Sequence, residues 1–354
     1  MVRITERTPR LLASVFLLIS LLRAGPITYA QEATRSIQAC ATLPDLGSLV
    51  REVGGDRVSV TVFAKGTEDP HFVEAKPSFI KALSQCDLYI QAGMDSEIGW
   101  APVLLRNARN GAVLPGGRGF LDASTVIAPL EVPTGPVDRS MGDVHPLGNP
   151  HYLLDALNGL RVARLIRDKL IELRPNHKTY FDERYAAFSK RLGAALVGEK
   201  LAKKYDVEKL ALLFERGRLG TFLKQQGDEA LLGGWLGLML PHHGVKSVDD
   251  HNIWPYFTRR FGIQLIGHME PKPGIPPTTG HLRALVERMR AEGVRLVLAA
   301  AYYDPRHARF ISENTGARVV NLANQVGARE GTDDYLGMID YNVRQLLGAL
   351  PGGR

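Results

Sequence analysis

The chain has 354 residues, of which 45% are hydrophobic and 23% charged, and its formal net charge is +7. These proportions fit an ordinary globular protein, and the length favours two domains over one. Four arginines against one glutamate contribute +3 of the charge before Ala30, which leaves +4 for the remainder. Because no run of lysine and arginine with interleaved aromatic residues occurs, the composition gives no case for nucleic-acid binding.

The first thirty residues have the pattern of a secretory signal. Arginines precede an apolar run over 11–22, which is shorter than the roughly 20 residues that span a bilayer. Ala30 closes a short cleavage motif before Gln31, and no cysteine stands near it. We therefore expect a soluble periplasmic protein, without a lipid anchor or stable membrane insertion. An uncleaved anchor is the alternative interpretation.

Strand and helix patterns alternate in the first part of the chain. Apolar or alternating β-branched runs predict strands, and helical spacing bounded by proline or glycine predicts helices. This order is typical of a parallel α/β sheet, which binds ligands at the carboxyl ends of its strands. The predicted strands are 37–42, 58–63 and 87–92, with weaker candidates at 112–114 and 124–127, and the predicted helices are 46–53, 79–84 and 98–107.

A stretch rich in proline and glycine, 129–150, ends this part. A long helical pattern follows over 152–173, and after Pro175 a second helix continues to about residue 203. We expect a rigid helical spine between two lobes. The expected divisions are a signal peptide over 1–30, a first α/β lobe over 31–150, linking helices over 151–203 and a second α/β lobe over 204–354.

The second half repeats the alternation of strands and helices, although no internal sequence repeat is visible. An apolar run at 209–214 is ambiguous between strand and helix. The predicted strands are 245–248, 263–266, 294–302 and 319–322, and the predicted helices are 222–239 (interrupted by two glycines), 253–261, 282–292, 307–315 and 335–350.

One histidine lies just past the predicted strand 58–63, in the segment TEDPHFVEAKPS. This residue, His71, follows Pro70, whose locked φ holds the segment stiff and biases Asp69 toward an extended conformation. A neutral imidazole presented in this way suits a metal, and nearby acids such as Glu68 orient it or add an oxygen ligand. A single loop histidine is more often a bystander, so the role of His71 depends on what lies opposite it.

Two further histidines share this context. His151 also follows a proline and begins the long helical pattern, and His251 follows the predicted strand 245–248. If the lobes face each other, one cleft collects His71, His151 and His251, and three imidazoles with an oxygen or water form a tetrahedral set that suits zinc. Spacing alone does not establish this, because the three are remote in sequence.

The other histidines are interpreted more simply. His145 precedes His151 by six residues and is expected to be a supporting neighbour rather than a ligand. The remainder are expected to be surface, turn or capping residues: His177, His242, His243, His268, His281 and His307.

Around the three candidate ligands the chain resembles a family. The residues DPHF, E and PS within 69–78 are similar to the first ligand motif of the solute-binding proteins of zinc/manganese ABC importers, the zinc-uptake-A-like family (cluster A-I). NPHY with an aspartate in 149–155 resembles the second motif. His251 with the aromatic and basic residues up to 262 resembles the third. The resemblance runs from about Ile37 to the C-terminus.

This resemblance implies two α/β lobes, each with a parallel sheet flanked by helices, joined by one long rigid helix, with one metal in the interlobe cleft. It implies His71, His151 and His251 as metal ligands. In many relatives a fourth ligand, an aspartate, follows the last strand, and here Ala323 stands at that position. The candidate replacements are water, Glu68, Glu270, Asp304 and Asn324, of which we favour water or Glu270.

The function implied is a periplasmic receptor that binds zinc with high affinity and delivers it to the permease of an ABC importer, and not an enzyme. Three imidazoles favour Zn²⁺ over Mn²⁺, which prefers more oxygen ligands. A manganese or iron receptor of the same class is the alternative. A zinc hydrolase is less expected, because no HExxH motif occurs, and a metal chaperone or adhesin forms a third class. We expect a monomer.

The chain has two cysteines, Cys40 and Cys86. Export permits a disulfide between them, and two buried thiols are an equal alternative. They lack the clustered spacing of a thiolate metal site.

Overall fold

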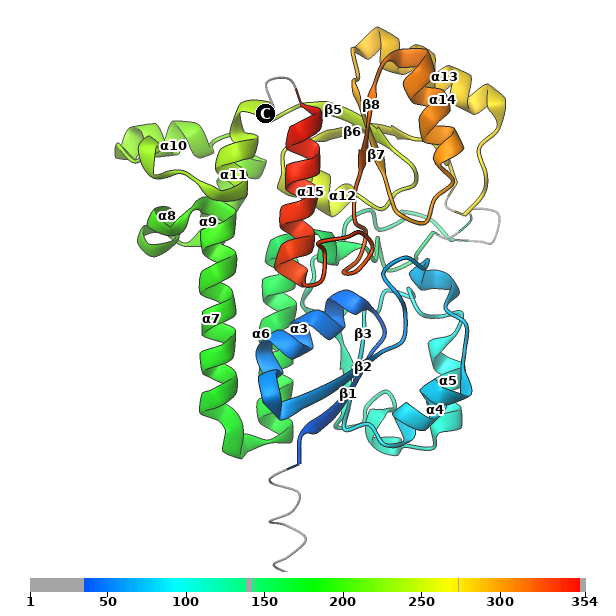
Figure 1. The fold of residues 1–354 in the computed structure, drawn as a ribbon, viewed down its shortest axis with the longest axis vertical. Coiled ribbons are helices and arrows are strands. Elements are labelled where there is room, and N and C mark those ends of the chain that lie inside the picture. The colour runs from blue at the N-terminus through cyan, green and yellow to red at the C-terminus, as the bar shows by residue number, and fades with distance from the viewer. Residues whose placement is uncertain (1–34, 138–141, 143, 273, 351–354) are drawn as a thin grey trace, which may run out of the picture. The chain divides into compact units, whose positions relative to one another are not determined.

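The computed structural model describes residues 35–137, 142, 144–272 and 274–350 (Figure 1). The predicted signal peptide over 1–30 lies outside the described residues. The chain from Ile37 onward forms one unit, separate from Met1–Ser36. Among the described residues, no helix has the length and apolar character that crossing a membrane requires.

The first sheet confirms the predicted parallel α/β pattern. Its four parallel strands lie in the order β2-β1-β3-β4. The weak candidates at 112–114 and 124–127 were wrong, because these runs fall largely in the 3₁₀ turns Gly111–Val113 and Ala123–Val126, and the fourth strand forms between them. The strands are β1 (Ile37–Ala41), β2 (Val58–Val62), β3 (Leu88–Gln91) and β4 (Phe120–Asp122), and the helices are α3 (Pro44–Gly54), α4 (Pro77–Ser84) and α5 (Ala101–Ala108).

The second sheet has the same topology, with four parallel strands in the order β6-β5-β7-β8. The strand that forms within the predicted run 294–302 is shorter than that run, because the chain leaves the sheet after Ala299. The strands are β5 (Lys246–Asp249), β6 (Gln264–His268), β7 (Leu296–Ala299) and β8 (Arg318–Asn321), and the helices are α12 (Pro255–Arg260), α13 (Thr279–Glu292) and α14 (Pro305–Thr315).

Two long helices connect the sheets, and they refine the expected spine. α6 (Ala156–Leu173) begins only after Asp155, whose carboxylate accepts a hydrogen bond from Leu157 N and caps it. α6 packs against the first sheet's α3, and the chain reverses at Pro175. The helix that joins the lobes is α7 (Lys178–Val197), which packs beside α6 and α3 and then contacts α11 (Gly234–Met239) (Figure 1).

The remaining helices lie around the second lobe. The ambiguous run 209–214 belongs to helix α9, and the predicted helix 222–239 is divided, since Gly227 adopts a left-handed conformation that ends α10. These elements are α8 (Glu199–Lys204), α9 (Val207–Glu215), α10 (Leu219–Gln226) and the C-terminal α15 (Tyr335–Ala349).

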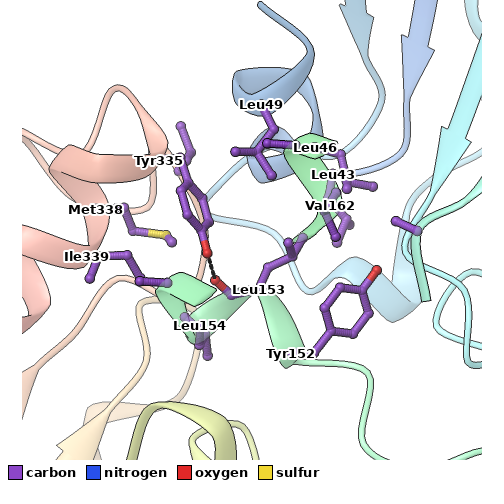
Figure 2. Packing of buried hydrophobic residues seen from close by; sticks show 14 of the residues in the cluster. Leu43, Leu46, Leu49, Tyr152, Leu153, Leu154, Val162, Tyr335, Met338 and Ile339 are labelled. Carbon is purple, nitrogen blue, oxygen red and sulfur yellow. Dashed lines mark hydrogen bonds between the residues drawn. The ribbon is translucent and has the colours of Figure 1, made fainter. Parts of the chain in front are cut away.

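The hydrophobic core includes the turn that precedes α6. Residues of the turn Tyr152–Leu154 pack between α3 and α15, as Figure 2 shows. The Tyr335 hydroxyl donates a hydrogen bond to the Leu153 carbonyl at 2.6 Å. The backbone beside His151 is therefore fixed by packing on both sides.

Candidate metal centre

One carboxylate in the segment before His71 holds both the backbone and the ring of this residue. Asp69 Oδ1 accepts hydrogen bonds from His71 N at 3.0 Å and from His71 Nδ1 at 2.8 Å, and it caps the short 3₁₀ turn Pro70–Phe72. The Trp100 indole donates to the Pro70 carbonyl at 3.0 Å. Because Nδ1 donates to the carboxylate, the neutral His71 ring carries its lone pair on Nε2.

His151 is positioned by the residue two before it. Asn149 Oδ1 accepts a hydrogen bond from His151 N at 3.0 Å, and Asn149 Nδ2 donates to the Asn252 carbonyl at 2.7 Å. The Tyr256 hydroxyl donates to the Asn149 carbonyl at 3.0 Å. Asn149 therefore connects the second predicted motif with the third.

His251 lies two residues past β5, at the edge where parallel strands present ligands. It is buried, with 5% of its surface exposed. Its Nδ1 has no hydrogen-bond partner among the described residues and stands 3.9 Å from Glu270 Oε2. The backbone below it is held by the adjacent Asp250, whose carboxylate accepts a hydrogen bond from Ala300 N at the end of β7.

The structure brings the three predicted ligands together and adds a fourth imidazole. Ring centroids are 5.5 Å apart for His71 and His151, and 6.3 Å apart for His151 and His251. His145 lies against His71, with ring centroids 5.0 Å apart and Nε2 atoms 3.0 Å apart. Two imidazoles on one zinc have centroids roughly 5 Å apart, from the usual Zn–N distance and tetrahedral angle.

The cluster is not a finished coordination sphere. Among the described residues, no group of three or more histidine, cysteine, aspartate or glutamate side chains is arranged so that it could hold a metal ion as it stands. His151, at the turn before α6, and His251, just past β5, have ring centroids 6.3 Å apart, which is wider than for two imidazoles on one zinc. Ligation therefore requires these two rings to approach each other.

Burial favours the neutral form of three clustered imidazoles, those of His145, His151 and His251. Desolvation, followed by the charge of His71, lowers the pKa of His251 to about 3 and that of His145 to about 4. The same two causes hold the pKa of His151 well below its usual value. A neutral imidazole is the form that binds a metal, so at neutral pH these donors need not lose a proton first.

A small cavity reaches the cluster from one side. Its volume is about 60 Å³, and His145, His151 and His251 line it together with Glu131. The Glu131 backbone has φ of 56°, in the left-handed region, and its carboxylate accepts hydrogen bonds from Asn149 Nδ2 and Asn252 Nδ2. A carboxylate at this position supplies a negative charge beside the route to the imidazoles.

The position of the missing aspartate offers no donor. Ala323 is buried, and Asn342 bonds both its N–H, at 2.7 Å, and its carbonyl, at 2.8 Å. The Glu68 carboxylate accepts hydrogen bonds from Lys65 N and pairs with Lys65 Nζ, both at 3.1 Å. Of the two candidate glutamates, Glu270 is the one that stands near the cluster, beside His251.

The histidines expected to have other roles lie in other contacts. His268 Nδ1 bonds Asp249 Oδ1 at 2.6 Å, and His281 Nε2 bonds the His268 carbonyl at 2.9 Å. Cys40 and Cys86 are free, buried thiols, and burial with a bond to Cys40 raises the pKa of Cys86. The sequence left open a disulfide or two buried thiols, and the structure shows two thiols.

Known proteins match this chain in sequence and in fold. The family model described as ZnuA, the periplasmic zinc-uptake complex component A, matches residues 40–208 and 238–349. The chain therefore belongs to this family of metal-importer substrate-binding proteins.

Individual relatives agree over nearly the whole length. The manganese ABC transporter substrate-binding lipoprotein PsaA of Streptococcus pneumoniae is 21% identical, over 95% of this chain and 96% of its own. The manganese-binding lipoprotein MntA of Halalkalibacterium halodurans is 22% identical, over 95% and 97%. A crystal structure of ZnuA superposes with a TM-score of 0.63 at 21% identity, covering 89% of this chain and 99% of that one. The two-sheet fold is thereby confirmed.

Three residues at the cluster were given no ligand or supporting role, or only a minor one, by the sequence analysis. His145 was expected to be a supporting neighbour, and its Nε2 atom lies 3.0 Å from the Nε2 atom of the candidate ligand His71. Asn149 appeared only as part of a motif, and Glu131 did not appear at all. The DVHP segment six residues before His151 was the available signal for His145.

Proposed function

We propose that this chain is the periplasmic receptor of an ABC importer, and that it captures zinc between His71, His151 and His251 and delivers it to a permease. The observation that carries this proposal is the meeting of three histidines that are remote in sequence: His71 after β2, His151 at the turn before α6, and His251 after β5. Family membership supports the metal-receptor class.

The donor chemistry supports zinc. The clustered side chains are imidazoles, which suit Zn²⁺, while Mn²⁺ prefers oxygen ligands. A manganese receptor is the second candidate, favoured by the names of the relatives from Streptococcus and Halalkalibacterium. For the fourth position, Glu270 is better placed than Glu68, whose carboxylate is paired with Lys65.

Delivery would use the interlobe position of the site. Because His151 begins the linking helices and His251 belongs to the second lobe, a movement of that lobe on the permease would remove one donor from the others. We propose a monomer with the lobe divisions stated above, exported by the predicted signal peptide. Absence of a lipid anchor stays a prediction, since several relatives are named lipoproteins.

Replacement of the three histidines tests this function. The His71→Ala/His151→Ala/His251→Ala variant should lose zinc binding in a competition titration against a chromophoric chelator, while its circular dichroism spectrum stays that of the wild type. An unchanged zinc affinity in this variant would refute the assignment. Hydrolysis of an ester or peptide that depended on zinc would point to an enzyme instead.

A further inference from the structure

We propose that His145 is the fourth metal ligand, completing an all-imidazole site with His71, His151 and His251. This inference rests on the proposed function and adds to it a donor that replaces the acid missing at Ala323. With this fourth ligand, all the protein atoms that bind the metal are imidazole nitrogens.

The strongest observation is the contact between two ring nitrogens. His71 Nε2 and His145 Nε2 are 3.0 Å apart. Two nitrogens bound to one tetrahedral zinc at the usual 2.0–2.1 Å are about 3.3 Å apart. The two atoms therefore already stand close to the separation that a shared ion would impose.

The hydrogen bonds around both rings direct lone pairs into this contact. His71 Nδ1 donates to Asp69, so the neutral ring has no proton on Nε2. The His145 ring also hydrogen-bonds the backbone of Met94, and this bond engages the ring's proton. Two lone pairs facing each other at this distance repel unless a proton or a cation lies between them.

Two backbone segments position His145: the bend after β3 and the turn that His145 itself begins. Met94, just past β3, has φ of 52°, and Asp95 has φ of 61°, so this bend uses the costly left-handed region twice. Gly148 N donates to the His145 carbonyl at 3.1 Å, which closes a turn directly before Asn149. His145 and His151 are thus presented by one short, hydrogen-bonded segment.

The cavity agrees with this placement. His145 lines the same cavity of about 60 Å³ as His151 and His251, and it also contacts His71. His145 therefore contacts His71 and borders the same cavity as the other two imidazoles. Glu270, the rival donor, lies 3.9 Å from His251 Nδ1 on the second-lobe side, where it suits orientation of that ring.

Zinc competition titrations of the full mature chain distinguish the possibilities. His145→Ala should lower zinc affinity by more than about 100-fold, because loss of an outer partner of a metal ligand costs 10–100-fold. His145→Gln, which keeps most of the volume, should show the same loss. His177→Ala, at the turn between α6 and α7, is the matched control and should bind as the wild type does.

Two spectroscopic readouts keep the test independent of folding. X-ray absorption of the zinc-loaded wild type should fit four imidazole nitrogens, and the visible bands of the cobalt-substituted protein should be tetrahedral and should change in His145→Gln. Three imidazoles with one oxygen would overturn the inference.

The outcomes separate this inference from the proposed function. If His151→Ala loses zinc while His145→Ala retains it, the function stands and the fourth-ligand inference falls. If Glu270→Gln, and not His145→Gln, removes the fourth donor from the spectra, the inference also falls. If none of these variants changes zinc affinity, the proposed function itself fails.

Discussion

The two sides of the histidine cluster differ in how firmly they are held. On the first side, Asp69 bonds His71 and Asn149 bonds the backbone of His151. On the second side, His251 Nδ1 has no hydrogen-bond partner among the described residues, and Glu270 is 3.9 Å away. We infer that the first side is preorganised, whereas the second side becomes ordered by the metal.

Removing one ligand from each side gives the largest expected effect. His151→Ala and His251→Ala should each reduce zinc affinity by about 1000-fold or more, since either loss leaves an incomplete tetrahedral set. The comparison predicts different kinetics: His251→Ala should still bind zinc weakly and quickly at the first side. Stopped-flow chelator competition measures this, and equally slow association in both variants would contradict the distinction.

The second side is connected to the first by a buried ion pair. Arg260 in α12 bonds Asp155 through Nε at 2.7 Å and Nη2 at 2.8 Å, beside the start of α6. Arg260→Met should lower the free energy of unfolding by about 3–5 kcal/mol, because it leaves a buried carboxylate without its partner.

Arg259 provides the matched control for this pair. Its guanidinium bonds Glu215 at 3.2 Å but is half exposed, so Arg259→Met should cost at most about 1 kcal/mol. Denaturant unfolding followed by circular dichroism measures both variants. Equal losses would show that the buried pair does not hold the two sides together.

Asp45, at the start of α3, should make stability depend on pH. Burial raises its pKa from 3.8 to about 7, against the opposing effect of the Asp45 and Val326 backbone. The folded state therefore binds a proton that the unfolded state has released, and stability falls as pH rises from about 4 to 7, by up to ~4 kcal/mol.

Asp45→Asn isolates this contribution. Val326 follows β8 in the second lobe, so the pair also probes the contact between the lobes. The wild type should lose stability relative to Asp45→Asn between pH 4 and pH 7 in urea unfolding. Parallel pH profiles for the two proteins would exclude a buried, protonated Asp45.

The smallest expected effect concerns the support of His71. Asp69→Asn keeps the shape of the side chain but removes the charge that holds the ring's Nδ1 proton. Zinc affinity should fall by about 10–100-fold, as for other outer partners of metal ligands. Glu74→Gln, an exposed acid in the same segment, is the control. If both variants bind equally, Asp69 does not preorganise the first side.

Much of this arrangement could be predicted from local sequence. Alternating β-branched runs predicted β2, and proline before His71 and His151 predicted stiff presentation of both. The helix predicted from residue 152 starts later, because packing of Leu153 against α15 competes with helical propensity. His145 could not be assigned, because it meets His71 across 74 residues of the chain, a long-range contact that local patterns do not reveal.

Metal analysis tests the central claim most directly. Protein purified from cultures without added metal should contain about one zinc per chain, and excess Mn²⁺ should not displace it in a competition titration. The variant lacking His71, His151 and His251 should contain none. Manganese as the main bound metal would contradict the assignment of zinc, and zinc retained in the variant would contradict the site.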